Sequence, residues 1–170
     1  SGSVGGYPVC STDGGLTAAC QMAYPENPHY CFMSPHMQKV IQTPFFMFNS
    51  KYDSWQLGNE LQTNWNTTDE QKAVVQYGKD FITQLQPALS EAKHGGMITS
   101  CICHGCPWPA LELEGKNSYE HYADWSYGKT SAGKNSFHID SRLPNGDGTL
   151  KLKNCVPFPG SDLTHSSVFV

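Results

Sequence analysis

The stretch Phe45-Phe46-Met47-Phe48-Asn49-Ser50-Lys51-Tyr52-Asp53 decides the fold that this sequence predicts. It begins with four consecutive apolar residues that do not alternate with polar ones, as expected of a strand buried on both faces of a parallel sheet. A carboxylate, Asp53, follows the strand. The stretch Met97-Ile98-Thr99-Ser100-Cys101 has the same character and is soon followed by His104. Two buried strands, each leading to a chemically active side chain, are therefore expected in the middle of the chain.

A long amphipathic helix is predicted between these two strands. Its start has capping chemistry, because the hydroxyl residues Thr67 and Thr68 precede Asp69-Glu70-Gln71. Apolar residues then recur at helical spacings as far as Leu89. We expect a helix from about Asp69 to Lys93, ended by glycine after His94.

Strand, helix and strand in this order form a βαβ unit, whose crossover is right-handed in nearly all proteins. In such open sheets the functional groups gather beyond the carboxyl ends of the strands. Asp53 and His104 are therefore expected on the same rim of the sheet. An aspartate there can fix the imidazole tautomer of a histidine that acts as a general base. The alternative is that Asp53 caps a turn and His104 lies in a disulfide-tied loop.

The remainder of the chain predicts less regular structure. Residues 1–30 are expected to form loops and turns, with at most a brief strand near Tyr7 to Cys10. Short helices are expected over 34–41 and 118–127. No internal repeat or sharp linker divides the 170 residues, so we expect a single domain over 1–170.

Composition excludes several classes of function. Charged residues make up only 15% of the chain, and the net charge is −4 with a pI of about 5.9. Without clustered Lys and Arg, nucleic acid is not an expected partner. No apolar stretch is long enough for a spanning helix, so we also expect no membrane span. The N-terminus lacks the pattern of a signal peptide, which favours a processed or partial product.

Seven cysteines favour an oxidising compartment, so a secreted or lumenal location is expected. The expected disulfides are Cys20 with Cys31, and a cysteine of the 101–106 cluster, taken here as Cys101, with Cys155. Disulfides are favoured over a metal site in this cluster, because four ligands within six residues do not easily surround one ion. No metal or cofactor is expected. Asn66-Thr67-Thr68 is an acceptor sequence for N-glycosylation.

The residues around both candidate catalytic side chains resemble the pectin acetylesterase and Notum carboxylesterase family. The similarity rests on Tyr52-Asp53-Ser54-Trp55-Gln56 and on Ser100-Cys101 followed by His104. Further similar segments are Cys10-Ser11-Thr12-Asp13-Gly14-Gly15, Cys31-Phe32-Met33 and His121-Tyr122-Ala123-Asp124-Trp125-Ser126. The resemblance implies an α/β-hydrolase fold, of which this chain would supply the C-terminal part of a mostly parallel sheet with flanking helices and disulfide-tied loops. It also implies that Asp53 is the acid and His104 the base of a serine-esterase triad.

The nucleophile that the resemblance implies is not evident. The family carries it in a Gly-Cys-Ser-Ala-Gly-Gly elbow between a strand and a helix, and this sequence has no such strand, turn and helix. Ser3 is formally a candidate, because Ser3-Val4-Gly5-Gly6 imitates the last four residues of the elbow. The nucleophile-bearing half is therefore expected in upstream sequence or in a second polypeptide.

The function implied by the resemblance is hydrolysis of an ester, with an acylated carbohydrate or glycoprotein as substrate. Trp55 is a candidate for stacking on a sugar ring, although such a residue more often serves core or rim packing. The alternative function is a catalytically inactive, hydrolase-like structural or carbohydrate-binding subunit of a larger extracellular assembly.

Overall fold

The computed structural model describes residues 17–128 and 136–142. The chain divides into two compact units, Ser1–Thr43 and Pro44–Val170. Some predictions fall outside the described residues: the brief strand near Tyr7, the candidate nucleophile Ser3 and the disulfide partner Cys155.

The first unit contains three short helical segments. They are α1 (Ala18–Ala23), a 3-10 helix η1 (Pro28–Phe32) and α2 (Ser34–Met37). The Thr17 side chain caps α1 by accepting a hydrogen bond from the Cys20 backbone N–H. The disulfide between Cys20 and Cys31, the local pair expected from the sequence, joins α1 to η1. Both cysteines are buried, so the disulfide takes the place of a larger apolar core in this unit.

The second unit is built on a parallel three-stranded sheet with the strand order β1-β2-β5. Its strands are β1 (Phe46–Tyr52), β2 (Gly95–Ile102) and β5 (Ser136–Ile139). Between β1 and β2 the chain forms α3 (Ser54–Asn59) and α4 (Thr68–Leu89). The βαβ unit and the α/β-hydrolase fold predicted from the sequence are thus confirmed.

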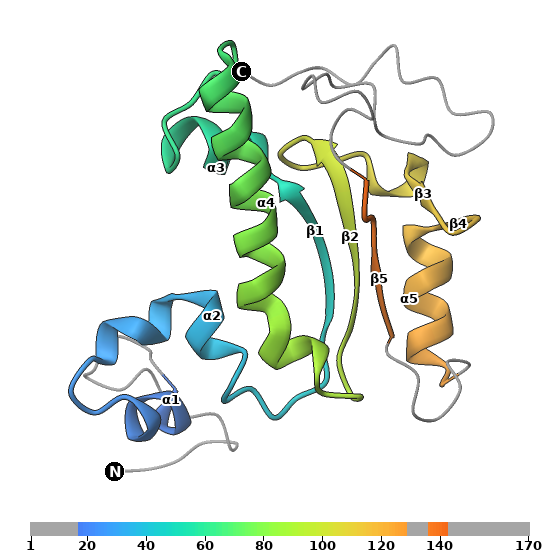
Figure 1. Cartoon of the computed structure of the whole chain (residues 1–170). Coiled ribbons are helices and arrows are strands. Elements are labelled where there is room, and N and C mark those ends of the chain that lie inside the picture. The colour runs from blue at the N-terminus through green and yellow to red at the C-terminus, as the bar shows by residue number, and fades with distance from the viewer. Residues whose placement is uncertain (1–16, 129–135, 143–170) are drawn as a thin grey trace. The chain divides into compact units, whose positions relative to one another are not determined.

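Helix α4 covers one face of the sheet, and helix α5 (Ser118–Ser126) lies on the other (Figure 1). On the α4 face, Leu85 and Ala88 pack against Ile98 of β2 and Phe137 of β5. On the α5 face, Met97 and Cys101 form a second cluster, to which the antiparallel pair β3 (Glu112–Leu113) and β4 (Lys116–Asn117) contributes Leu113. Every residue of β2 is buried, as expected of a central strand in a parallel sheet. The expectation that the run Phe45–Phe48 is buried on both faces is wrong, because Phe48 is exposed and only Ser50–Tyr52 of β1 are fully buried.

Helix α4 crosses β1 at very short range where Gly78 faces Tyr52. A Cβ on Gly78 would overlap the Tyr52 ring, so only glycine allows this approach. Tyr52 and Val74 belong to the cluster at this end of the sheet, together with Leu57 of α3. This packing fixes the end of β1 at the residue before Asp53.

Several expectations about local structure are corrected. Helix α4 ends at Leu89 instead of near Lys93, and Gly95 and Gly96 are the first residues of β2 rather than a helix cap. His94, which precedes these glycines, is buried: its ring stacks on Phe45 at 3.9 Å and Nδ1 accepts a hydrogen bond from the Phe45 backbone N–H.

Two more histidines make contacts that the sequence did not reveal. His121 is buried on α5 and contacts the ring of His138 at 3.9 Å. His138 in turn binds the Glu114 carboxylate through Nδ1 at 2.7 Å. Neither contact was foreseen, because strand β5, which carries His138, was itself not predicted.

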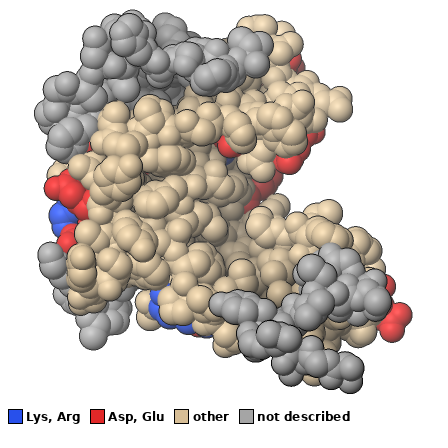
Figure 2. Space-filling view, turned by 180° about the vertical axis from the view of Figure 1, so that it is seen from behind, with Lys and Arg blue, Asp and Glu red and all other residues tan. Residues whose placement is uncertain are grey.

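The surface agrees with the low content of charged residues. On the face shown in Figure 2, uncharged side chains cover most of the described surface. Among the helices that the structure describes, none is both long and apolar enough to cross a membrane.

Candidate active site

Asp53 lies directly after the last residue of β1 and begins helix α3. Its carboxylate caps that helix by accepting hydrogen bonds from the backbone N–H groups of Trp55, at 2.9 Å, and Gln56, at 3.1 Å. The alternative that Asp53 caps a turn is thus modified, because the residue caps a helix that was not predicted. This cap does not compete with a catalytic role, since Oδ2 takes no part in the two bonds. Two backbone N–H groups hold the carboxylate in one orientation.

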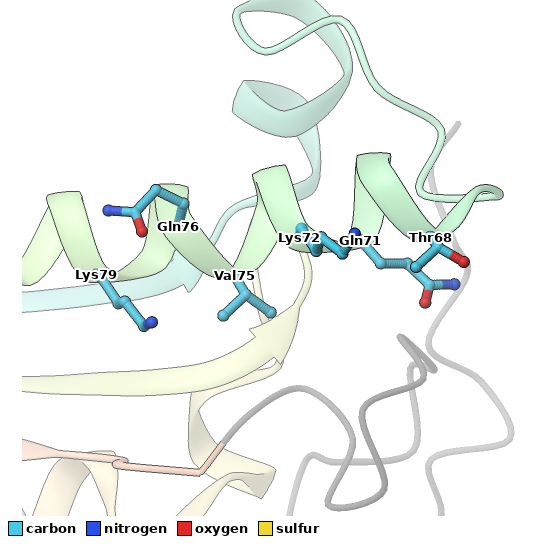
Figure 3. Close-up of a pocket in the computed structure, with 6 residues that line it drawn as sticks. All are labelled: Thr68, Gln71, Lys72, Val75, Gln76 and Lys79. Carbon is cyan, nitrogen blue, oxygen red and sulfur yellow. The ribbon is translucent and has the colours of Figure 1, made fainter.

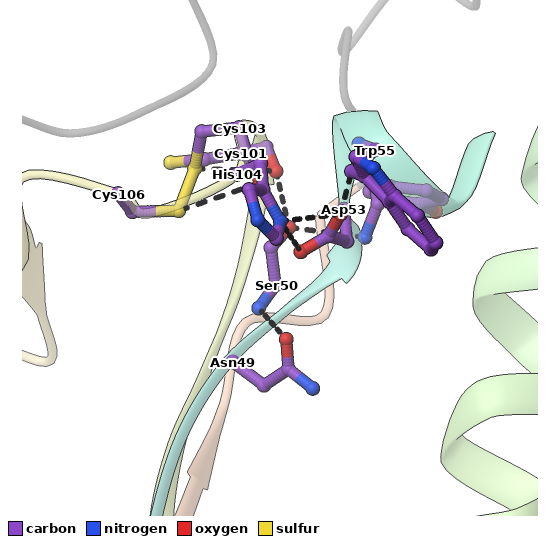
Figure 4. Close-up of a disulfide and its surroundings, with 9 residues drawn as sticks. Asn49, Ser50, Asp53, Trp55, Cys101, Cys103, His104 and Cys106 are labelled. Carbon is purple, nitrogen blue, oxygen red and sulfur yellow. Dashed lines mark hydrogen bonds and ion pairs between the residues drawn. A yellow bond between two sulfur atoms is a disulfide. The ribbon is translucent and has the colours of Figure 1, made fainter. Parts of the chain in front are cut away.

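His104 lies just beyond the end of β2, in a loop that a disulfide closes. Cys103 and Cys106 are bonded to each other, so His104 and Gly105 are the only residues between the two bridged cysteines (Figure 4). Gly105 has φ of +62°, a conformation that glycine adopts without strain. Strand end, disulfide and glycine together turn the His104 side chain toward the end of β1.

The two side chains meet at the carboxyl end of the sheet. His104 Nδ1 lies 2.9 Å from Oδ2 and 3.1 Å from Oδ1 of Asp53 (Figure 4). The Asp53 side chain is 13% exposed, whereas that of His104 is 61% exposed. The structure therefore brings together the two predicted catalytic residues, with the acid enclosed and the base open to a substrate.

This geometry selects one histidine tautomer. The carboxylate accepts a hydrogen bond from the N–H at Nδ1, which leaves the lone pair of the neutral ring on Nε2. No hydrogen-bond partner for Nε2, and so no serine hydroxyl bonded to it, is found in residues 17–128 and 136–142. The pair can accept a proton at Nε2 and stabilise the resulting imidazolium through Asp53.

Trp55 lies beside this pair on the first turn of α3. Its side chain is 52% exposed, and its ring centroid is 6.3 Å from that of His104. The structure thus places all three of the residues proposed for catalysis and substrate contact at one rim of the sheet.

A cluster of hydrogen bonds around the buried Asp140, which the sequence did not reveal, links the strands at the same rim. Lys51 donates from Nζ to the Asp140 backbone carbonyl at 2.7 Å, and Ser100 donates from Oγ to Asp140 Oδ2 at 2.6 Å. Arg142 adds two side-chain bonds of 2.8 Å to the same carboxylate. Burial opposes ionisation of Asp140, but the bonds from Arg142 and Ser100 outweigh it and hold the pKa of Asp140 below its ordinary value.

The remaining predicted site residues are accounted for as follows. Cys101 is disulfide-bonded, and its expected partner Cys155 lies outside the described residues. The Cys103–Cys106 disulfide was not anticipated, although two cysteines separated by two residues are a recognisable signal. Asn66 is exposed immediately before α4. No cluster of three or more His, Cys, Asp or Glu residues suited to a metal ion occurs within the described part of the chain.

A surface hollow of about 330 Å³ lies elsewhere, along α4 (Figure 3). It is lined by Thr68, Gln71, Lys72, Val75, Gln76 and Lys79. None of these residues contacts the Asp53–His104 pair, so the hollow is not assigned to the active site.

A parallel sheet with helices on both faces and an Asp–His pair beyond the carboxyl ends of adjacent strands is the architecture of an α/β hydrolase. Comparison with solved structures agrees: the fold is similar to that of the Wnt deacylase Notum from Drosophila, with a TM-score of 0.64 and 18% sequence identity. The match covers 79% of this chain and 38% of Notum.

The family follows from comparison of sequences. The pectinacetylesterase family model matches residues 11–147. Pectin acetylesterase 11 of Arabidopsis thaliana is 30% identical over 105 residues, which cover 52% of this chain and 26% of the relative. Pectin acetylesterase 5 of the same plant is 27% identical over 128 residues, or 60% of this chain and 30% of the relative. The chain belongs to the pectinacetylesterase family, and it spans less than a third of the length of these two relatives.

Proposed function

We propose that this chain supplies the acid and the base of a serine-type carboxylic ester hydrolase. The observation that supports this proposal is the contact of both Asp53 oxygens with Nδ1 of an exposed His104. Family membership and the deacylase named among the similar structures favour an ester or acyl bond as the target. The substrate class we propose is an acylated carbohydrate or glycoprotein, with acetyl as the acyl group.

In the proposed reaction, His104 Nε2 takes the proton from a serine hydroxyl as that oxygen attacks the acyl carbon. The imidazolium, stabilised by Asp53, then returns the proton to the oxygen of the departing alcohol. Water then attacks the acyl-enzyme while His104 takes a proton from it. His104 returns this proton to the serine oxygen as the carboxylic acid leaves. The serine must come from sequence outside the described residues, where Ser3 is the candidate within this chain.

Trp55 is proposed to contact the carbohydrate. An indole that is half exposed beside the base offers a flat apolar face on which a sugar ring can stack. The proposal places the sugar over α3 while its ester oxygen reaches His104. We expect Trp55→Ala to raise KM for an acetylated oligosaccharide about tenfold with little change in kcat, as measured by acetate release. Tyr119→Ala, which removes an exposed aromatic side chain from α5, is the matched control.

A secretory location and glycosylation at Asn66 complete the proposal. Disulfides within both units fit an oxidising compartment. The exposed Asn66 is accessible to a glycosyltransferase.

Hydrolysis of an acetyl ester by the purified protein tests the proposed activity. The comparison is between wild type, His104→Ala and His29→Ala, since His29 is an exposed histidine of the first unit. The control is needed because an exposed imidazole can itself attack an activated ester. We expect the rate to fall at least a hundredfold in His104→Ala alone. A Ser3→Ala variant tests the candidate nucleophile in the same assay.

Equal rates in the wild type and His104→Ala would reject the esterase proposal. The alternative, an inactive carbohydrate-binding subunit, would then be supported if the wild type bound acetylated pectin and Trp55→Ala did not. The exposed Trp55 is the observation that keeps this second function open.

A further inference from the structure

The parallel pairing of β1 with β2 is irregular close to the active site. Ser50 pairs with Thr99, whereas Tyr52 pairs with Ile102, so β2 contains one residue more than β1 across this interval. An extra residue bends its strand and changes the direction of the side chains that follow. The irregularity precedes both Asp53 and His104, so it bears directly on where these two residues lie.

One side chain bridges the two strands at this point. The Ser50 hydroxyl accepts a hydrogen bond from the Tyr52 backbone N–H at 3.0 Å and donates its own proton to the Cys101 carbonyl of β2. Ser50 is 1% exposed, so water does not satisfy these groups. A buried carbonyl and N–H left without partners would each be costly, and a single hydroxyl satisfies one of each.

The bridge is placed symmetrically with respect to the catalytic pair. Ser50 precedes Asp53 by three residues on one strand, and Cys101 precedes His104 by three residues on the other. The hydroxyl therefore joins the two segments at equal chain distance from the acid and from the base. No closer side-chain bond links β1 to β2 ahead of the pair within the described residues.

We propose that Ser50 is a positioning residue, whose hydroxyl sets the register in which Asp53 and His104 meet. It contacts neither substrate nor the reacting atoms, and it acts through the two strand ends. The proposal rests on the function proposed above, because the Asp53–His104 contact is what Ser50 would maintain.

Ser100 offers a matched control for this role. It is also a fully buried serine of the same sheet, and its hydroxyl also makes a buried hydrogen bond, but to Asp140, directly after the neighbouring strand β5. Ser50→Ala and Ser100→Ala therefore remove the same atoms from equally buried sites. Only the first removes the bridge between β1 and β2.

The test is the proton NMR signal of the His104 ring N–H that is hydrogen-bonded to Asp53, recorded at low temperature on the full chain. Asp53→Ala identifies the signal by abolishing it. We expect Ser50→Ala to move the signal upfield or to speed its exchange with water at least tenfold. Ser100→Ala is expected to leave it unchanged, although both variants lose stability. Ser50→Cys keeps the shape of the side chain with a weaker donor and is expected to give an intermediate exchange rate.

A folded Ser50→Ala protein with the wild-type signal would overturn the proposal. If Ser50→Ala does not fold, a folded Ser50→Cys protein with unchanged exchange would overturn it equally. Failure of both variants to fold would assign Ser50 a general structural role and reject the positioning role. A wild type that lacks the Asp53-dependent signal would contradict the catalytic pair itself, which separates failure of the proposed function from failure of this inference.

Discussion

At the scale of single residues, Asp53 performs two tasks with one carboxylate. Oδ1 accepts hydrogen bonds from two backbone N–H groups of α3, and Oδ2 makes the shorter contact with His104. Substitution by asparagine can separate the two tasks, because an amide oxygen still caps a helix. The amide NH2 would then face His104 Nδ1 and favour the opposite tautomer, with the proton on Nε2.

We therefore predict that Asp53→Asn changes stability by less than about 0.5 kcal/mol, because Asn and Asp are comparable caps. It should lower kcat on the order of 10⁴-fold, because the base is held in the wrong tautomer. Asp53→Ala should lower kcat to the same extent and should also lower the free energy of unfolding by about 1 kcal/mol. Urea denaturation and ester hydrolysis measure the two effects. Equal losses of stability in both variants would contradict the separation of tasks.

The sequence revealed the residues of the candidate pair but not those that support it. Asp53 and His104 could be found because each follows a buried strand, and parallel strands end at one rim. Ser50 and Asp140 could not, since their roles depend on an irregular strand pairing and on a short third strand. Hydrogen bonds between residues distant in the sequence leave no periodic signal.

At the scale of elements, the His104 loop depends on the Cys103–Cys106 disulfide. The bridge closes a very short loop, so it contributes about 2 kcal/mol at most through chain entropy. Its main effect is on local order at the base.

We predict that Cys103→Ser with Cys106→Ser lets the loop open locally while the sheet stays folded. Backbone amide exchange should speed up in residues 103–106 and remain slow in β2, as measured by hydrogen–deuterium exchange. The paired substitution Cys20→Ser with Cys31→Ser is the control, because it removes a disulfide that closes a different loop. Unchanged exchange at 103–106 would show that the strand end alone orders the loop.

The start of α4 combines a helix cap with the glycosylation acceptor. Thr67 accepts from the Glu70 backbone N–H, and the Glu70 carboxylate accepts from the backbone N–H groups of Asn66 and Thr67. Thr68 supplies the hydroxyl of the acceptor sequence but is not the capping residue. The two functions can therefore be removed separately.

We predict a glycan at Asn66 when the protein passes through a eukaryotic secretory pathway. Asn66→Gln and Thr68→Ala should each remove the mass shift caused by peptide N-glycosidase. Thr67→Ala should keep the glycan and lose about 1 kcal/mol of stability with the cap. A glycan-free wild type from such cells would contradict the prediction.

Among the elements, the sequence predicted those with strong patterns. The apolar runs of β1 and β2 and the capped, periodic α4 were recognisable, and the parallel arrangement of the two strands followed from the order of the elements. Strand β5 was missed because it has only four residues, and only the first two, Ser136 and Phe137, are buried. The pair β3–β4 is shorter still, and tertiary contacts with α5 stabilise it more than local preference does.

At the scale of the whole molecule, buried polar groups make the stability depend on pH. His94 and His121 are both enclosed, and burial is the main cause that lowers the pKa of each. His94 needs a neutral ring, because Nδ1 accepts from the Phe45 backbone N–H. His121 lies 2.8 Å from the Leu113 carbonyl, to which Nε2 donates.

The direction in which pH changes the stability follows from the lowered pKa values of His94 and His121. An unfolded histidine titrates near pH 6.5, so just below that pH the unfolded chain binds protons that the folded chain excludes. The free energy of unfolding must therefore fall as the pH decreases from about 6.5 toward the folded pKa values. Each histidine can contribute a slope of up to about 1.4 kcal/mol per pH unit. Asp140 adds little in this window, because its pKa is lowered from an already acidic value.

We predict that the midpoint of urea denaturation is lower at pH 5.5 than at pH 7.5. His121→Gln should be less stable at pH 7.5, since it loses ring packing, but its stability should change less between the two pH values. The other histidines are the same in both proteins, so the difference in slope reports His121 alone. His29→Gln, which alters an exposed ring, is the control for the substitution itself. A slope that is the same in wild type and His121→Gln would show that His121 is protonated in the folded protein, contrary to the effect of its burial.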